Sequence, residues 1–470
     1  MKTINIGSKE VIHFIGIGGI GMSAIAEILH SKGFTVSGSD ITDNIIIRRL
    51  KKKGIKVFSK HAKQNIRNVD IVVYSSAVKF SNIEIKSAIK KKIPLYSRAM
   101  MLADVMRLKS SITVSGSHGK TTSTSLISCI LERANFDPTI INGGIINGIG
   151  ANAKLGNGEW IVAEADESDG SFTMLPSTIG VINNIDLEHL DYYKNLDDIK
   201  ASFVKYANNI PFYGFLSINI DDKNIFNIFD KINHKQIYTY GFSKKANFSA
   251  ANVQIIKKNN TFFSCFDIIN NIEKKILKKV LIPLIGSHNI SNTLAAYSVS
   301  KGLKITDSLI KEALKRFKGV KRRFSIIYKS SDTLIIDDYA HHPKEIKMTL
   351  NALKKITKNK LIAIFEPHRF SRIKELKEDF INSFENADII FVLPIYTAGE
   401  KPIKTINNFE LSKLFKNKYK EKIISSIDGC KSNFNEIKKT ISRKDNIIFL
   451  GAGFSSSIAE EFKNFVEKNE

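Results

Sequence analysis

The stretch Ser111–Ser128, SITVSGSHGKTTSTSLIS, predicts a β-strand, a tight glycine loop and a helix in direct succession. Ile112 and Val114 favour a strand, which ends where Gly116 and Gly119 introduce the loop. A loop of this kind directs backbone N–H groups and a helix N-terminus towards an anion. The stretch therefore predicts a phosphate site inside an α/β domain.

The residues after the second glycine extend that prediction to a nucleoside triphosphate. Lys120 adds a mobile positive charge for a terminal phosphate, and the hydroxyl of Thr121 can hold Mg²⁺. Turn chemistry alone does not explain Gly-Lys-Thr-Thr at the start of a helix. The loop is nevertheless unusual, because two residues separate its glycines where the usual phosphate loop has four. The predicted ATP-binding residues of this loop are Gly116, Ser117, His118, Gly119, Lys120, Thr121 and Thr122.

Composition indicates a soluble globular protein of two or three domains, with 470 residues, 43% hydrophobic and 25% charged. The net charge of +25 suggests nucleic acid as a partner. The lysines, however, come in short scattered groups without interleaved aromatic residues, so we expect solvated helix faces and no nucleic-acid partner. A positive field also favours anionic small substrates.

Cysteine usage and hydropathy bear on the compartment. The cysteines Cys129, Cys265 and Cys430 are far apart and form neither a metal spacing nor a disulfide framework, which predicts a reducing, cytoplasmic environment. No stretch of about 18 apolar residues predicts a membrane span, so we expect no membrane insertion.

A second glycine loop lies near the N-terminus. Gly16, Gly18 and Gly21 satisfy G-x-G-x-x-G between a short apolar strand and a helix, and Asp40 ends the next strand about twenty residues later. This pattern predicts a bound pyrophosphate without saying that the nucleotide is NAD. A nicotinamide-dependent dehydrogenase is therefore one interpretation, although it leaves the loop at Lys120 unexplained.

Alternating strands and helices predict an α/β fold of three domains. We expect an N-terminal Rossmann-like parallel sheet in residues 1–107, a central P-loop ATPase-type domain in residues 108–320, and a C-terminal Rossmann-like domain in residues 321–470. Within the central domain, we expect a turn at Asn142-Gly143-Gly144.

Acidic residues follow two of the central strands. Glu164-Ala-Asp-Glu-Ser-Asp169 follows a strand at Trp160–Glu164, and residues 184–191, which include Glu188, His189 and Asp191, follow another. Acidic groups at strand ends near a phosphate loop are where Mg²⁺ ligands are expected. His288 and Asn289 open a later helix, where they either read a nucleotide base or merely cap the helix.

The C-terminal domain shows four strands that end in polar or glycine-rich tips, which predicts another parallel sheet with its site at one edge. Arg369 and Arg372 follow the strand at Leu361–Phe365 and are close enough in sequence to grip one carboxylate. A pair of surface arginines is the alternative.

From about Val11 to Gly453 the chain resembles the Mur ligase family of peptidoglycan synthesis. Within that family it is most similar to the members that join L-alanine to UDP-N-acetylmuramate. The short spacing of the phosphate loop is similar to the family's own version. The motifs that carry the resemblance are Gly16-Ile-Gly-Gly-Ile-Gly-Met-Ser23, Gly116-Ser-His-Gly-Lys-Thr-Thr122, Glu164-Ala-Asp-Glu-Ser-Asp169, Asp337-Asp-Tyr-Ala-His-His-Pro343, Pro367-His-Arg-Phe-Ser-Arg372 and Gly399-Glu-Lys-Pro-Ile403.

The resemblance implies an ATP-dependent amide ligase with two Mg²⁺ ions. We expect a monomer or weak homodimer. Lys120 would contact the β- and γ-phosphates, and Thr121 and Glu164 would hold one Mg²⁺. Glu164 and His189 would hold the second. The residues implied at the rest of the ATP site are His288, Asn289, Arg323 and Asp338. Those implied for the UDP substrate are Gly16, Gly18, Gly19, Gly21, Asp40, Ser75 and Ser76, and those implied for L-alanine are Tyr339, His368, Arg369 and Arg372.

Two residues depart from the family pattern. Ser117 replaces the usual threonine and keeps a hydroxyl, whereas Glu188 stands where aspartate is frequent, so we expect His189 to be the better ligand. The nearest alternative is the murein-recycling ligase, which attaches a tripeptide to the same sugar nucleotide. Ser168 and the run His368–Arg372 favour the alanine-adding members.

Overall fold

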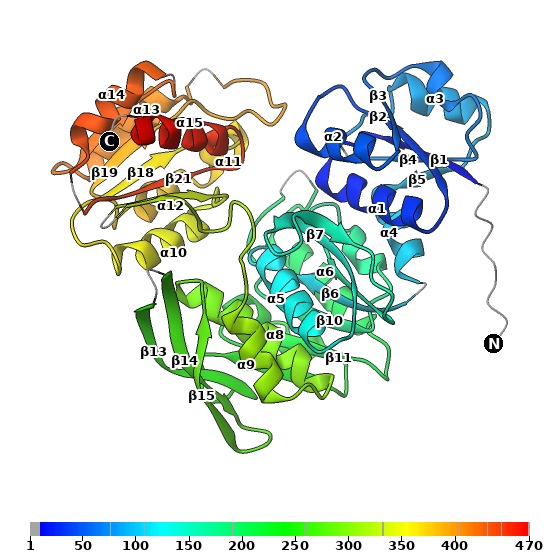
Figure 1. The fold of residues 1–470 in the computed structure, drawn as a ribbon, viewed down its shortest axis with the longest axis horizontal. Coiled ribbons are helices and arrows are strands. Elements are labelled where there is room, and N and C mark those ends of the chain that lie inside the picture. The colour runs from blue at the N-terminus through cyan, green and yellow to red at the C-terminus, as the bar shows by residue number, and fades with distance from the viewer. Residues whose placement is uncertain are drawn as a thin grey trace. The chain divides into compact units, whose positions relative to one another are not determined.

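The computed structural model describes residues 10–468 except 76, 108, 190, 191, 259, 260, 331, 332, 404, 430 and 443. The described chain forms two compact units. The first runs to Asn252 and includes Phe266–Leu281 and Ser291–Lys318, and the second comprises Val253–Cys265, Ile282–Ile290 and the chain from Gly319 onward. Sheets of five, ten and six strands, each accompanied by helices, confirm the predicted α/β fold (Figure 1).

The N-terminal sheet is entirely parallel, with strand order β3-β2-β1-β4-β5. Helices α1 and α4 cover one face and α3 covers the other (Figure 1). The order reverses beside β1, and ligands bind in such sheets at the carboxyl ends of the strands next to that point. The strands are β1 (Val11–Ile15), β2 (Thr35–Ser39), β3 (Lys56–Phe58), β4 (Ile71–Tyr74) and β5 (Leu95–Ser97). The helices are α1 (Ile20–Ser31), α2 (Ile45–Lys52), the short 3₁₀ helix η1 (Lys63–Ile66), α3 (Ile83–Lys90) and α4 (Arg98–Met106).

The central sheet has the strand order β15-β14-β13-β12-β11-β10-β6-β9-β7-β8. Its strands are β6 (Ser110–Ser115), β7 (Thr139–Ile146), β8 (Ala151–Lys154), β9 (Trp160–Glu164), β10 (Ile179–Ile182), β11 (Phe215–Asn219), β12 (Ile237–Gly241), β13 (Phe248–Lys258), β14 (Thr261–Asn270) and β15 (Lys275–Ile282). Its helices are α5 (Lys120–Arg133), η2 (Ser171–Met174), α6 (Leu196–Asn208), α7 (Lys223–Phe226), η3 (Phe229–Lys231), α8 (Ser287–Gly302) and α9 (Asp307–Lys315).

Strand β6 lies between β10 and β9 and is parallel to both. It is buried on both faces, so its polar residues need internal partners. The Thr113 hydroxyl finds them in Ser177 Oγ and Tyr206 Oη, each at 2.6 Å. Ser115 pairs in register with Ile182, and Val114 pairs with Glu164, so the loops after β6, β9 and β10 leave the same edge of the sheet.

The predicted turn at Asn142-Gly143-Gly144 is wrong. These residues lie within β7, which pairs in parallel with β9 and antiparallel with β8. The register with β8 shifts between Ile141 and Ile146. Glycines within a strand often mark such an irregularity or a close approach, and here Gly143 N–H donates to Glu164 Oε1 at 2.6 Å.

The C-terminal sheet has the order β16-β17-β21-β18-β19-β20. Its strands are parallel except for β16, which pairs antiparallel with β17 at the edge and departs from the predicted parallel sheet. Helices α14 and α15 cover one face, and α10 and α12 cover the other (Figure 1). The strands are β16 (Ser325–Lys329), β17 (Leu334–Asp338), β18 (Leu361–Phe365), β19 (Ile389–Val392), β20 (Ile423–Ser426) and β21 (Asn446–Leu450). The helices are α10 (Pro343–Lys354), α11 (Phe370–Glu375), α12 (Lys377–Ser383), α13 (Asn408–Lys418), α14 (Lys431–Thr440) and α15 (Ser455–Lys468).

None of the helices in the described part of the chain combines the length and apolar character that crossing a membrane requires.

Candidate active site

The phosphate loop between β6 and α5 depends on both of its glycines. Gly116 and Gly119 have φ angles of +130° and +80°, which disfavour any other residue. A Cβ atom at Gly119 would also clash with the side-chain oxygen of Asn292. The loop thus keeps its backbone close to neighbouring groups, with α5 beginning at Lys120.

The loop after β10 holds the phosphate loop in place. Asn184 accepts from the N–H of His118 through Oδ1 at 2.7 Å and from the N–H of Ser117 through its carbonyl at 3.2 Å. The Asp186 N–H donates to Ser117 Oγ at 2.8 Å. The hydroxyl at position 117, retained in place of the family's threonine, therefore joins the two loops.

Lys120 lies at the centre of the site. Its ammonium donates to the Gly116 carbonyl at 2.7 Å and to both carboxylate oxygens of Glu167 at 2.8 and 2.9 Å. Burial alone would lower the pKa of Lys120, but the charges of Glu167 and Asp166 outweigh burial and raise it. The side chain is therefore a fixed positive charge at the carboxyl edge of the sheet.

An acidic cluster with one histidine lies beside this charge. The ligand atoms of Glu167, Glu188 and His189 are all within 4.8 Å of one another. His189 Nε2 is 3.6 Å from Glu167 and 3.7 Å from Glu188. Burial opposes protonation of His189, yet the two carboxylates outweigh it and raise its pKa. Two carboxylates with one imidazole are a donor set that fits a divalent cation.

Glu164, a predicted metal ligand, ends β9 in the same region. Its carboxylate accepts from Gly143 N–H, and a Cβ at Gly143 would come within 2.6 Å of Oε2. Thr121, the other predicted ligand of one ion, is buried in the first turn of α5. Glu167 is the residue that sequence reasoning missed, although it lies only three positions after Glu164 in the same acidic motif. Asp191 lies outside the described residues.

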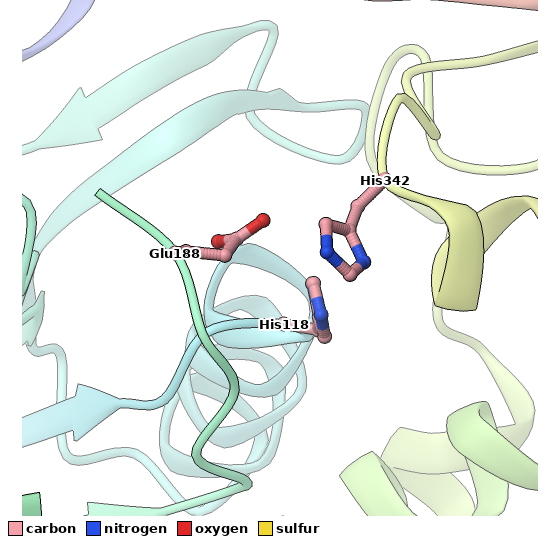
Figure 2. A group of neighbouring side chains, drawn as sticks. All are labelled: His118, Glu188 and His342. Carbon is pink, nitrogen blue, oxygen red and sulfur yellow. The ribbon is translucent and has the colours of Figure 1, made fainter. Parts of the chain in front are cut away.

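His118 is part of the same region (Figure 2). Its Nε2 is 3.1 Å from Asp186 Oδ2, and both side chains are 7% exposed. Figure 2 shows His118 at the end of the phosphate loop and Glu188 on the coil after β10, and their ligand atoms lie within 4.8 Å. His342, which Figure 2 also labels, belongs to the second unit, where its ring accepts from Lys344 N–H at the start of α10.

Helix α8 carries the residues predicted for the nucleotide base. The side-chain amide of Asn289 donates to the Ile285 carbonyl at 2.9 Å, a local contact at the start of the helix. A Cβ atom at Gly286 would come within 2.6 Å of the His288 ring. One turn later, Asn292 accepts from Ser123 Oγ at 3.2 Å beside Gly119. Asn292 was also missed, although it repeats Asn289 at a spacing of three and so lies on the same helix face.

The N-terminal glycine loop is organised by Asp40. Gly18 N–H donates to Asp40 Oδ2 at 2.8 Å, and Gly16 N–H donates to the Ser39 carbonyl at 2.8 Å. A Cβ at Gly16 would meet the side chain of Ser75 at 3.2 Å. Asp40 and Ser75 therefore flank the loop, at the ends of β2 and β4, while Ser76 lies outside the described residues.

In the second unit, rings line the carboxyl edge of the C-terminal sheet. His341 lies 5.3 Å from Tyr339 and 5.2 Å from His368 between ring centroids, and His368 stacks on Tyr396 at 5.5 Å. The Arg372 guanidinium donates to His368 Nδ1 at 2.9 Å. Since His368 accepts there, it is neutral, and burial together with the two nearby arginines lowers its pKa to about 4.

The other predicted residues of this edge lie close by. The Arg323 guanidinium is 5.0 Å from the centroid of the Tyr339 ring. Asp338 accepts from the N–H groups of Phe324 and Ala340 at 2.7 and 2.8 Å, and burial raises its pKa to about 6. Arg369 directly precedes α11 and has a φ of +64°. This edge thus joins guanidinium groups with neutral rings, which suits an anion that also carries an apolar or amino group.

Family profiles match along most of the chain. The profile described as Mur ligase family, catalytic domain, matches residues 11–110, the Mur ligase middle domain matches residues 114–300, and the Mur ligase, glutamate ligase domain matches residues 322–453. The chain belongs to the Mur ligase family. The resemblance and the three-domain α/β fold predicted from the sequence are thereby confirmed.

Individual proteins and structures of this family are similar to the chain along nearly its whole length. A UDP-N-acetylmuramate–L-alanine ligase of Rickettsia felis is 47% identical over 459 residues, covering 96% of this chain and 95% of that protein, and one of Rickettsia typhi is 48% identical over 457 residues, covering 96% and 91%. The crystal structure of a UDP-N-acetylmuramate-alanine ligase from Thermotoga maritima has a TM-score of 0.81 at 27% identity, over 98% and 99% of the two chains. A murein peptide ligase from Psychrobacter arcticus shares the fold, with a TM-score of 0.70 at 22% identity over 97% and 98%.

Proposed function

We propose that this enzyme joins L-alanine to the carboxylate of UDP-N-acetylmuramate, with ATP converted to ADP and phosphate. The observation that carries the proposal is the 47% identity, over 96% of the chain, to the UDP-N-acetylmuramate–L-alanine ligase of Rickettsia felis. The chemistry of the central domain supports it, because a charged lysine in a glycine loop beside an acidic cluster suits transfer of a phosphoryl group.

The nucleotide is ATP, with Mg²⁺ as the cation. Lys120 would bind the β- and γ-phosphates, and Gly116–Thr122 would surround the phosphate chain. The carboxylates of Glu164, Glu167 and Glu188, with His189 and the Thr121 hydroxyl, would hold Mg²⁺; oxygen-rich donors of this kind fit that ion. When bound, Mg²⁺ neutralises the charge of the phosphates and of the transferred group.

In the first step, a carboxylate oxygen of the muramyl group attacks the γ-phosphorus of ATP. The bond between that phosphorus and the β,γ-bridging oxygen breaks, and ADP leaves. Lys120 stabilises the negative charge that builds up on the transferred group, since its ammonium is fixed by the loop before the reaction begins. The N-terminal glycine loop would hold the UDP diphosphate and so position the carboxylate.

In the second step, the amine of L-alanine attacks the acyl carbon, phosphate leaves, and the amine loses a proton as the amide forms. Arg369 and Arg372 would bind the alanine carboxylate, with Tyr339 and His368 beside it. His288, Asn289, Arg323 and Asp338 would bind the remainder of the nucleotide. We assign these roles to domains spanning residues 1–107, 108–320 and 321–470, and we infer that the reaction takes place in the cytoplasm.

An ADP-release assay tests the proposal. The purified chain, with Mg²⁺, ATP and UDP-N-acetylmuramate, should release ADP when L-alanine is added. Parallel reactions contain glycine, L-serine or the murein tripeptide instead. Release with the tripeptide but not with L-alanine would favour the recycling ligase, and release with neither would overturn the proposal.

A further inference from the structure

Arg98 is a cation of the first unit that lies between the two glycine loops. Arg98 is the first residue of α4 and directly follows β5, which is parallel to β4. It therefore emerges at the carboxyl edge of the N-terminal sheet, where the loop between β1 and α1 also lies. From this edge Arg98 forms an ion pair with Asp166, in the acidic motif after β9.

Arg98 packs directly on the first turn of α1. A Cβ atom at Gly21 would lie 2.9 Å from Arg98 Nη1 and 3.3 Å from its Cδ. Gly21 has no positive φ angle, so its backbone does not demand glycine. A side chain at this position would meet the Arg98 guanidinium, so the third glycine of the N-terminal motif leaves the space that Arg98 occupies.

The same guanidinium reaches the central domain. Arg98 Nη2 lies 3.3 Å from Asp166 Oδ2, with the two side chains 24% and 38% exposed. Asp166 immediately precedes Glu167, which holds the Lys120 ammonium. Burial opposes the negative charge of Asp166, yet Lys120, Arg98 and His189 together lower its pKa. A continuous set of charges thus runs from the turn at Gly21 to the phosphate loop.

We propose that Arg98 couples the two substrate sites, so that binding of the UDP diphosphate at the N-terminal loop strengthens binding of Mg²⁺ and ATP at Lys120. This inference rests on the proposed function. A diphosphate at the first turn of α1 competes with Asp166 for the guanidinium. As Arg98 turns towards the phosphates, Asp166 loses a positive neighbour, and the acidic motif becomes a better partner for a cation.

The size of the effect follows from the exposure of the pair. Partly exposed ion pairs contribute little, so a change in the Arg98–Asp166 contact should alter affinity about two- to fivefold. Coupling is reciprocal for equilibrium binding. The Kd of the UDP substrate and the Kd of the nucleotide should therefore change by the same factor when the other ligand is bound. This equality distinguishes coupling from the indirect loss of one site.

Isothermal titration calorimetry on the full chain measures this factor. The Kd of UDP-N-acetylmuramate is determined alone and with saturating Mg²⁺ and a non-hydrolysable ATP analogue, and the ratio is the coupling factor. We expect a ratio of about two to five for the wild type, near one for Arg98→Ala and Asp166→Asn, and intermediate for Arg98→Lys. Arg107→Ala, which removes the exposed partner of Asp104 on the same helix, should keep the wild-type ratio.

Two outcomes would overturn the inference. One is a Kd ratio of one for the wild-type protein when both ligands bind. This result needs no variant, and it does not affect the ADP-release test of the proposed function. The other is an Arg98→Ala protein that binds both ligands and keeps the wild-type ratio. A purely structural role for Arg98 would lower Tm without changing the ratio, so it counts as the second outcome.

Discussion

The Lys120 ammonium lies 2.8 and 2.9 Å from the two carboxylate oxygens of Glu167, and Glu167 is almost completely buried. The loop thus holds a charged lysine at the edge of the sheet. Under the proposed function, a phosphate bound there would exchange one anionic partner of Lys120 for another. The acidic cluster would then be free to bind a cation.

Replacement of Lys120 by alanine should separate the two nucleotide sites. We expect ADP release to fall by about 10²–10³-fold, as when one preorganised charge donor to a transition state is lost. The Kd of UDP-N-acetylmuramate should change less than about twofold, since the N-terminal loop is intact. Lys413→Ala, at an exposed pair with Glu410 on α13, is the matched control. An equal loss of turnover and UDP-substrate binding would contradict separate sites.

Replacement of Glu167 by glutamine should destabilise the first unit. Breaking a buried ion pair by removing one partner costs about 3 kcal/mol, because Lys120 keeps its charge without a carboxylate. For a unit of this size we expect Tm to fall by about 5–10 °C, measured by thermal unfolding without nucleotide. The double variant Lys120→Met/Glu167→Gln should recover most of the loss. A double variant with the summed losses would show that the two side chains do not interact.

Replacement of Gly18 by alanine should weaken the UDP substrate specifically. The new Cβ would lie 2.8 Å from Asp40 Oδ2 and would disturb the bond between that oxygen and the Gly18 N–H. We expect KM for UDP-N-acetylmuramate to rise about tenfold, the effect of losing one charge-assisted hydrogen bond, while KM for ATP stays constant. Gly148→Ala is the control, since its Cβ meets nothing closer than 3.9 Å. Unchanged KM values in both variants would show that the N-terminal glycine loop is not part of the UDP-substrate site.

The stability of the second unit should depend on His368 in mild acid. Burial, Arg372 and Arg369 lower its pKa to about 4, with Glu400 opposing them, and its neighbour His341 has a pKa well below the usual value for the same primary reason. Unfolded histidine titrates near 6.5, so only the unfolded chain binds the proton as pH falls from about 6.5 towards 4. The stabilising effect of the neutral ring is complete above pH 6.5 and is lost on acidification.

The measurement for this prediction is Tm between pH 7.5 and 5. Wild-type Tm should fall below about pH 6.5, and His368→Gln should show a smaller fall, because one of the two neutral rings no longer takes part. Identical pH profiles for both proteins would show that the environment of His368 is the same in the folded and unfolded chains.

The sequence predicted the strands at Trp160–Glu164 and Leu361–Phe365 with their observed bounds. Each is a short apolar run followed by polar or glycine residues, so local chemistry determined both ends. The strand at Asn142–Gly144 was missed, because adjacent glycines favour a turn locally while pairing with β8 and β9 holds them extended. Long-range pairing of this kind leaves little trace in composition.

The candidate site, too, combines features that local sequence predicts with features that depend on long-range pairing. Gly116, Lys120 and His189 could be predicted because glycine spacing and acidic strand ends are local patterns. The ion pair between Lys120 and Glu167 could not, since it depends on the register that brings β6 beside β9. Nor could the contact of Arg98 with Gly21 and Asp166, which joins residues 77 and 68 positions away in the sequence.

The most direct test of the central claim uses UDP-N-acetylmuramate labelled with ¹⁸O at both carboxylate oxygens. The enzyme is incubated with this substrate, Mg²⁺, ATP and L-alanine, and the released phosphate and the nucleotide product are analysed by mass spectrometry. If the carboxylate takes the γ-phosphoryl group and alanine displaces it, phosphate should carry one ¹⁸O and the amide product should retain the other. Unlabelled phosphate, or no alanine-dependent phosphate at all, would contradict the account.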